Sequence, residues 1–201
     1  MDMLDLLAVS PVAFFITLVS IVIAIGIHEA AHCYMADRLG DPTPRSQGRV
    51  TLNPLAHLDP IGTIAIILTG FGWGKASPYD PYNLRNPKKD VTLIALAGPA
   101  SNIILAVLLA IVLRLLPSGS LLSVPFIYVI ALNINLALFN LLPIKPLDGS
   151  KILTRDNPYQ NQNSLFLLLL FLIPLFNGYS LASLIISPVS RFLLGLLIPG
   201  A

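Results

Sequence analysis

The chain has 201 residues, of which 55% are hydrophobic and 11% charged, and its formal net charge is +2. This composition, with a mean hydropathy of +0.80, excludes an ordinary soluble domain and predicts an all-α polytopic membrane protein surrounded by the lipid bilayer. The small net charge gives no reason to expect nucleic acid as a partner.

Four apolar segments approach the roughly 20 residues that cross a hydrocarbon core about 30 Å thick. In chain order they are residues 6–27, 91–113, 124–142 and 165–186. The acidic start predicts that the first segment is retained and not removed as a secretory signal. The final region, 165–198, contains Pro174 and Pro188, so it could form one crossing plus an interfacial helix, or two crossings. We expect one membrane-embedded domain over 1–201, with its core over about 10–155 and a C-terminal helical region over 164–200.

Two segments between the first and second crossings have other predicted forms. Residues 61–74 would span only about 21 Å as a helix and contain four glycines, which favours a re-entrant segment or an interfacial loop. Residues 48–54, GRVTLNP, alternate enough to form a short β-strand that could pair with an extended substrate. A plain loop is the alternative for this second segment.

The basic residues indicate how the chain is oriented. Of the 12 Lys and Arg residues, all except Arg114 and Arg191 lie in three polar stretches, 36–60, 75–90 and 144–163. If these stretches share one side of the membrane, the positive-inside rule makes that side the cytoplasm. This orientation requires that residues 61–74 do not cross.

The sequence IVIAIGIHEAAHCYMADRLG, residues 21–40, places two histidines and a glutamate at the end of an apolar run. His28 and His32 are four residues apart, so a helix puts them on one face with Glu29 beside His28. This spacing lets two imidazoles reach one Zn²⁺ while the carboxylate can take a proton from a metal-bound water. Glu29 is the only glutamate in the chain, and ionisable groups inside membrane segments are usually functional. The alternative is a polar pair satisfied at a helix end.

A catalytic zinc commonly has three protein ligands. The candidates for the third are Cys33, Asp37, His57, Asp59 and Asp148. We expect Cys33 to be a buried small hydrophobe, Asp37 to be solvated near the helix end, and His57 to be an exposed loop residue. Asp148 follows an apolar segment that ends at two prolines, where it could equally be a turn or N-cap residue. The orientation above decides for Asp148, because it brings this residue to the same side as the histidine pair.

The pairing of HEAAH in one membrane segment with NLLPIKPLDG at the end of a later one resembles the site-2 proteases, the zinc intramembrane metalloproteases. The likeness extends from about residue 21 to about 153 and includes TLNPLAHLDPIGT and AGPASN. It implies a minimal member, without PDZ or CBS modules, that has a three-helix catalytic core. It also implies that His28, His32 and Asp148 bind one Zn²⁺ and that Glu29 is the general base and acid on zinc-bound water.

The resemblance further implies that Asn140 stabilises the oxyanion or contacts substrate, although a hydrogen bond between helices is the alternative. For Asn133 and Asn135 we prefer that alternative. The small residues of LAGPASN, among them Gly98, are expected to let helix backbones approach closely.

The expected function is a zinc-dependent intramembrane endopeptidase that hydrolyses peptide bonds in or near transmembrane segments of membrane proteins. We expect an integral multi-pass protein in the plasma membrane of a prokaryote, with its active site near the cytoplasmic side. The alternatives are a catalytically inactive relative that binds membrane proteins and a metal carrier. The complete His28, Glu29, His32 and Asp148 set argues against the first, and the absence of a second ligand cluster in the sequence argues against the second. The oligomeric state is not predicted.

Overall fold

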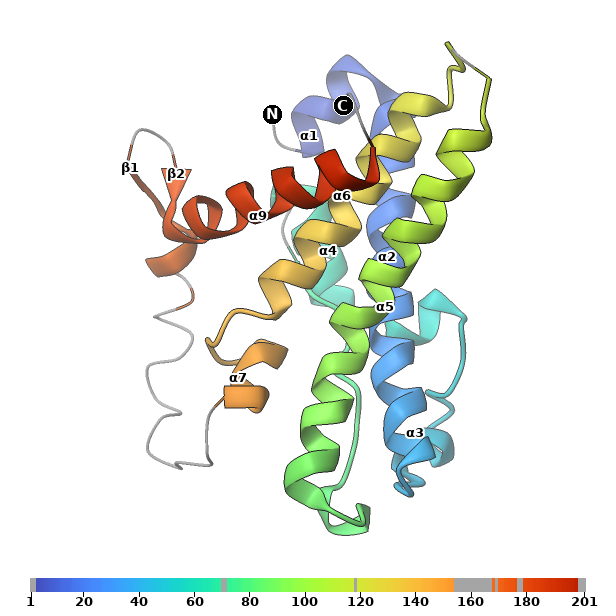
Figure 1. The fold of residues 1–201 in the computed structure, drawn as a ribbon, viewed down its shortest axis with the longest axis vertical. Coiled ribbons are helices and arrows are strands. Elements are labelled where there is room, and N and C mark those ends of the chain that lie inside the picture. Colours follow the sequence, from blue (N-terminus) through green and yellow to red (C-terminus); the bar gives the residue numbers. More distant parts are fainter. Residues whose placement is uncertain are drawn as a thin grey trace. The chain divides into compact units, whose positions relative to one another are not determined.

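The computed structural model describes residues 3–69, 72–117, 119–153, 168, 170–176 and 179–198. They fall into two compact units, Met1–Ser101 and Asn102–Ala201 (Figure 1). Three described helices are long and apolar enough to cross a membrane: α2 (Pro11–Arg38), α5 (Pro87–Leu115) and α6 (Ser123–Asn140). The predicted all-α polytopic membrane protein is confirmed.

The first unit begins with two helices where the sequence suggested one segment from residue 6. Helix α1 (Met3–Val9) ends before Ser10, whose side chain accepts a hydrogen bond from the Ala13 amide and caps α2. Pro11 then starts α2, where its missing N–H costs no hydrogen bond. The first crossing therefore starts at Pro11, and the predicted start at residue 6 is wrong.

The polar segment after α2 contains short helices but no strand over residues 48–54. Helix α3 (Thr43–Ser46) is followed by bends and by the 3₁₀-helix η1 (Pro54–His57). The Asn53 side chain accepts a hydrogen bond from the Leu55 amide and so caps η1. Because Asn-Pro favours this turn, the strand expected from alternation at GRVTLNP is wrong.

The segment between residues 58 and 74 folds back on itself. Helix α4 (Pro60–Thr69) occupies its middle, and Leu58 pairs with Gly74 as an antiparallel bridge. A side-chain carbon at Gly62 would overlap the Trp73 carbonyl, so glycine permits this close return. Both ends of the segment therefore lie together, as a re-entrant segment or an interfacial loop requires.

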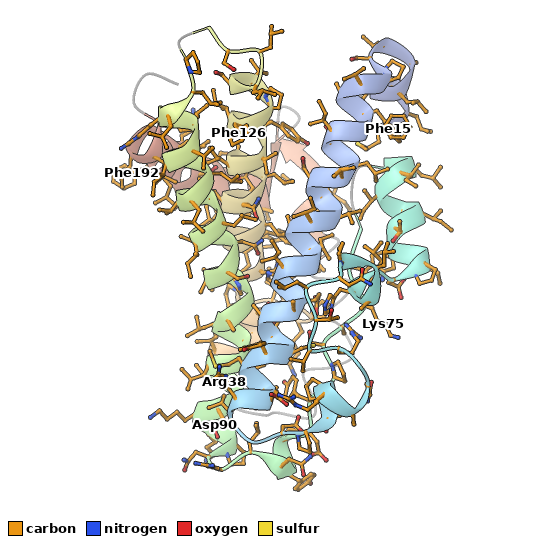
Figure 2. The ribbon with its side chains drawn as sticks, turned by 90° about the vertical axis from the view of Figure 1, so that its right-hand side faces the viewer. Phe15, Arg38, Lys75, Asp90, Phe126 and Phe192 are labelled. Carbon is orange, nitrogen blue, oxygen red and sulfur yellow. The ribbon has the colours of Figure 1, made fainter. Side chains whose placement is uncertain are left out.

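The charged end of the first unit lies where α2 ends and α5 begins. Figure 2 shows Arg38 and Asp90 at this end, and Phe15 near the other end of α2. A small apolar cluster of Ala36, Leu84 and Ile94 packs there. The 3₁₀-helix η2 (Pro81–Asn83) completes the loop that leads into α5.

Asp41 ties the loops at this end together. Its carboxylate accepts hydrogen bonds from the Asp80 amide, the Asn83 side chain, and the Thr43 amide and hydroxyl. Burial alone would raise the pKa of Asp41, but these hydrogen bonds outweigh it, so the pKa lies below the ordinary carboxyl value. The ionised form is therefore the one that the fold stabilises.

We expect Asp41→Asn to lower the free energy of unfolding by about 1–3 kcal/mol at neutral pH, because an amide cannot accept all of these bonds. A carboxyl with a depressed folded pKa stabilises above its unfolded pKa, about 3.9, and loses that contribution as the pH falls through the folded value. The difference in melting temperature between wild type and Asp41→Asn in detergent should thus shrink below about pH 4. An equal difference at pH 7 and pH 3 would contradict this assignment.

In the second unit α6 packs against α9 (Leu181–Leu197). Its main apolar cluster contains Ala106, Ala110, Ile130 and Ile134, so α5 also contributes. Helix α7 (Asp148–Leu153) follows α6 after a short loop. Strands β1 (Pro174–Phe176) and β2 (Tyr179–Ser180) pair antiparallel just before α9.

This hairpin contradicts a continuous membrane helix over residues 165–186. Pro174 has no N–H, which helps to explain why helix gives way to extended chain there. Helix α9 is apolar but shorter than the three long helices. Residues 154–167, 169, 177, 178, 199 and 200 lie outside the described residues, so the number of crossings stays open.

Candidate metal centre

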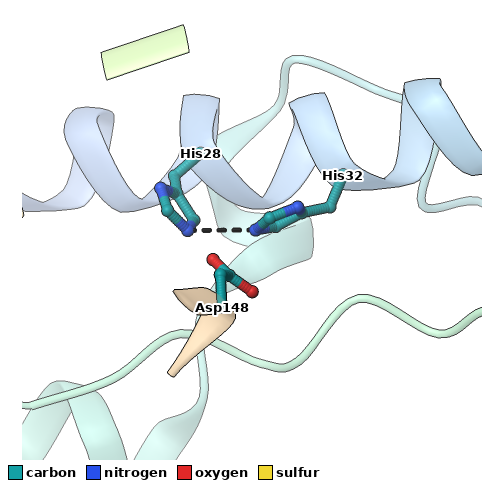
Figure 3. Close-up of side chains that lie close together, drawn as sticks. All are labelled: His28, His32 and Asp148. Atoms are coloured by element: carbon teal, nitrogen blue, oxygen red, sulfur yellow. Dashed lines mark hydrogen bonds between the residues drawn. The ribbon is translucent and has the colours of Figure 1, made fainter. Parts of the chain in front are cut away.

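Helix α2 presents two histidine rings on one face, as their spacing predicts. The Nε2 atoms of His28 and His32 are 3.0 Å apart, and both side chains are buried (Figure 3). Two nitrogens bound at 2.0–2.1 Å to one tetrahedral zinc would lie about 3.3 Å apart. The separation of the two ring nitrogens therefore fits a shared zinc ion.

The position of His32 is fixed from outside its own helix. Its Nδ1 lies 2.6 Å from the Ile94 carbonyl oxygen of α5, which can only accept a hydrogen bond. Nδ1 therefore carries the proton, and Nε2 presents a lone pair toward His28. A histidine held by its other nitrogen in this way is the usual arrangement in a metal site.

Gly98 of α5 faces the two rings. A side-chain carbon at this position would lie 2.6 Å from His28 Nε2 and would overlap His32 Nε2 as well. The glycine thus leaves room at the point to which both nitrogens are directed. The atoms nearest to Gly98 belong to the histidine rings and not to a helix backbone, so the expected close approach of helix backbones at LAGPASN stays a prediction.

Glu29 lies beside the pair and is held by a residue that the motif did not indicate. The Ser77 hydroxyl lies 2.6 Å from Glu29 Oε2 and 2.9 Å from the Glu29 carbonyl oxygen, and both are acceptors. The two residues are 48 positions apart. No local sequence signal links a serine in FGWGKASP to the glutamate of HEAAH, so sequence reasoning missed it.

Asp148 begins α7 and is buried in the second unit. Lys151 donates a hydrogen bond to its Oδ1 at 3.0 Å and forms an ion pair with it. The next residue is glycine because a side-chain carbon at Gly149 would overlap the Leu141 carbonyl. This contact holds the start of α7 against the end of α6.

Within the described part of the chain, one set of three residues could each offer a ligand atom to a metal ion. The set is His28, His32 and Asp148, which are drawn in Figure 3.

Three other candidates for the third ligand have different partners. Cys33 is fully buried, as expected of a small hydrophobe, and donates a hydrogen bond to Ser77. Asp37 is paired with Arg45 through two hydrogen bonds of 2.8 and 2.6 Å. Asp59 accepts a hydrogen bond from the Gly62 amide at the start of α4.

His57 was expected to be exposed, and this is wrong. Its side chain is completely buried, with Nε2 2.9 Å from the Thr51 carbonyl oxygen and Nδ1 3.4 Å from Nη2 of Arg49. The 3₁₀-helix η1 that carries this ring packs against α2, and periodicity could not reveal that contact. His57 is therefore an interior residue of the first unit.

The three asparagines of α6 have different surroundings. Asn133 accepts a hydrogen bond from the Asn102 side chain of α5 at 2.9 Å, which confirms the expected contact between helices. Asn135 lines a hollow between α6 and α9. The Asn140 amide donates to the Leu136 carbonyl of its own helix at 2.9 Å. Its role in hydrolysis stays a prediction.

The chain is similar to proteins that are provisionally named zinc metalloproteases. YwhC of Bacillus subtilis (strain 168) is 40% identical over 144 residues, which cover 67% of this chain and 66% of YwhC. Rip2 of Mycobacterium tuberculosis (strain ATCC 25618 / H37Rv) is 31% identical over 183 residues, which cover 83% of this chain and 70% of Rip2. MJ0611 of Methanocaldococcus jannaschii is 46% identical over 66 residues, which cover 33% of this chain and 34% of MJ0611.

The profile of Peptidase family M50 matches residues 114–156, which include α6 and Asp148. No solved structure matches the chain significantly. The alignment with Rip2 covers most of both proteins, and the ring geometry of His28 and His32 suits the metal in the relatives' names. The chain therefore belongs to peptidase family M50, the site-2 proteases, whose cofactor is zinc.

Proposed function

We propose that this chain is a zinc-dependent endopeptidase that cleaves peptide bonds in or near the transmembrane segments of other membrane proteins. The observation that carries the proposal is the buried His28 and His32 pair, with Glu29 between them, inside a helix long enough to cross a membrane. A water-activating group at membrane depth suits a substrate that is itself embedded in the bilayer.

His28 and His32 would hold the zinc ion together with Asp148. When bound, zinc would act as a Lewis acid that polarises the scissile carbonyl. Three protein ligands leave one coordination position open, as a catalytic zinc site requires. The burial of all three candidate ligands and the space left by Gly98 support this assignment.

The remaining steps fall to residues of the chain. Glu29 would accept a proton from the attacking water and later return it to the leaving amine. Ser77 already occupies Oε2 of this carboxylate, which leaves Oε1 for the proton. Asn140 would donate a hydrogen bond to the oxyanion through the N–H of its amide that does not bond to the Leu136 carbonyl.

We propose that the reaction occurs near the cytoplasmic side of a prokaryotic plasma membrane. The concentration of basic residues in three polar stretches supports this orientation through the positive-inside rule. In the first unit, two of these stretches adjoin the C-terminal end of α2, a few residues beyond His32.

The proposed activity is tested with the full chain in detergent and a model single-span substrate. We expect cleavage within or close to the span, its loss after zinc is removed by a chelator, and its return when zinc is added back. Fragment masses would locate the cleaved bond. Absence of cleavage of any span by zinc-loaded protein, or undiminished cleavage by protein shown to be metal-free, would overturn the proposal.

Asp148→Ala tests the third ligand. We expect its zinc affinity to fall by at least about 10–100-fold, because one of three anchoring atoms is lost. Asp37→Ala is the matched control, since it removes a carboxylate that pairs with Arg45 and does not belong to the candidate ligand set. Zinc content after dialysis against a competing chelator measures both. Full zinc retention in Asp148→Ala would exclude it as a ligand.

A further inference from the structure

The segment Gly74 to Ser77 lies directly beside Glu29, although no feature of the HEAAH motif requires a neighbour there. A side-chain carbon at Gly74 would lie 3.3 Å from Glu29 Cγ, and Ser77 contacts the carboxylate itself. The segment reaches this place because Gly74 pairs with Leu58 after the fold-back. It therefore forms one wall of the space around the proposed base.

The hydrogen bonds at Ser77 have a defined direction. Cys33 Sγ lies 3.3 Å from Ser77 Oγ and donates to it, so the serine oxygen already accepts a hydrogen bond. The single hydroxyl proton is then directed to Glu29, where the carboxylate Oε2 at 2.6 Å is nearer than the carbonyl oxygen at 2.9 Å. Such a bond to an ionised carboxylate is stronger than one between neutral groups and fixes the side chain's rotamer.

The segment is held by a buried arginine. Arg49 is 4% exposed, and its guanidinium donates to the carbonyl oxygens of Lys75 at 2.6 Å and Ala76 at 3.4 Å. Arg49 forms no ion pair with another residue that the structure describes, and its Nε has no hydrogen-bond partner there. Burying a cation without a paired anion costs free energy. A buried arginine at this position therefore indicates a role beyond packing.

His57 supports the same arrangement from the other side. Its Nε2 donates to the Thr51 carbonyl, which leaves Nδ1 to accept from Arg49. Its carbonyl oxygen accepts a hydrogen bond from the Lys75 amide at 2.8 Å. Arg49 and His57 thus fix the backbone on which Ser77 is presented.

We propose that Ser77 is a positioning residue that orients the Glu29 carboxylate, and that Arg49 anchors the segment that carries it. This inference rests on the proposed function, in which Glu29 is the base. By occupying Oε2 and the side of the carboxylate toward Ser77, the serine directs Oε1 to the attacking water. Neither Ser77 nor Arg49 is placed in contact with the scissile bond.

The contact between Ser77 and Glu29 can be measured directly by NMR. Glu29 is the only glutamate, so selective ¹³C labelling of the glutamate side-chain carboxyl gives a single carboxylate resonance. In metal-free protein at one fixed pH, Ser77→Ala should shift this resonance and Ser77→Thr should restore the wild-type position. Ser46→Ala, at an exposed serine in α3, is the control and should leave the resonance unchanged.

A second experiment measures kcat and KM of the same variants after they are loaded with zinc. We expect Ser77→Ala to lower kcat about 10–100-fold with little change in KM and with full zinc content, and Ser77→Thr to recover most of the loss. Arg49→Lys keeps the charge but not the fork of donors, and it should shift the resonance and lower kcat in the same direction.

The outcomes separate the two proposals. If zinc-loaded wild type cleaves no substrate, the proposed function fails, while the resonance still tests the contact. If wild type cleaves but Ser77→Ala keeps the wild-type resonance and kcat, Ser77 is not a positioning residue. If only Arg49→Lys is without effect, the anchoring part is overturned and the role of Ser77 stands.

Discussion

Glu29→Gln should lower kcat by about 10²–10⁴ while zinc stays bound, because glutamine has nearly the same shape but cannot accept the proton of the attacking water. The proposed ligands His28 and His32 remain unchanged in this variant. The Ser77 hydroxyl can still donate to the amide oxygen, so the side chain should stay in place. Cleavage rate and zinc content, measured on the same preparation, check this expectation.

Asp37→Asn is the matched control for this variant. It also removes one carboxylate from α2, two turns further along, where the carboxylate is paired with Arg45 and not directed at the histidines. A partly exposed ion pair contributes little to the stability of the fold. Asp37→Asn should therefore leave kcat within about twofold of the wild-type value. Undiminished cleavage by Glu29→Gln would remove Glu29 from the mechanism, and loss of zinc would give it a structural role instead.

The parts of the structure that the sequence could predict are those set by local periodicity. Long apolar runs specify α2, α5 and α6 regardless of what surrounds them, because each must satisfy its own backbone in lipid. The four-residue spacing of His28 and His32 likewise determines that their rings share a face. The distance between their nitrogens then follows from helix geometry alone.

One error in the prediction arises from a contact between distant segments and another from a local turn signal. His57 is buried in η1, which packs against α2, and no helical or strand period predicts this contact between separate elements. The strand expected over 48–54 gives way to η1 because Asn53 and Pro54 favour a turn, a local signal that outweighs weak alternation.

The contacts of Ser77 and Arg49 show a second limit of prediction from the sequence. Their contacts with Glu29 and with residues 75 and 76 join parts of the chain that pattern analysis treats separately. A serine or an arginine in a polar loop ordinarily faces water, so composition gives no reason to place Ser77 beside the Glu29 carboxylate or Arg49 in the interior. Only the path of the chain after α4 brings Ser77 to Glu29, and residues 75 and 76 to Arg49.

Gly98→Ala should reduce bound zinc to a trace, although it adds a single methyl group. The new carbon would lie 2.6 Å from His28 Nε2 and overlap His32 Nε2, so both rings must turn away from their common point. His32 would also lose its hydrogen bond to the Ile94 carbonyl if it moved. Loss of geometry at two ligands together should exceed the 10–100-fold cost of disturbing one supporting contact.

Gly195→Ala is the control, because nothing lies within 4 Å of a carbon added at this helical glycine. Alanine is favoured over glycine in a helix by about 1 kcal/mol, so both variants gain the same propensity and differ only in what the methyl group meets. Zinc content and the melting temperature with and without zinc distinguish them: Gly98→Ala should fold but show no stabilisation by zinc. Retention of about one zinc ion per chain in Gly98→Ala would mean that the metal is not held between these two rings.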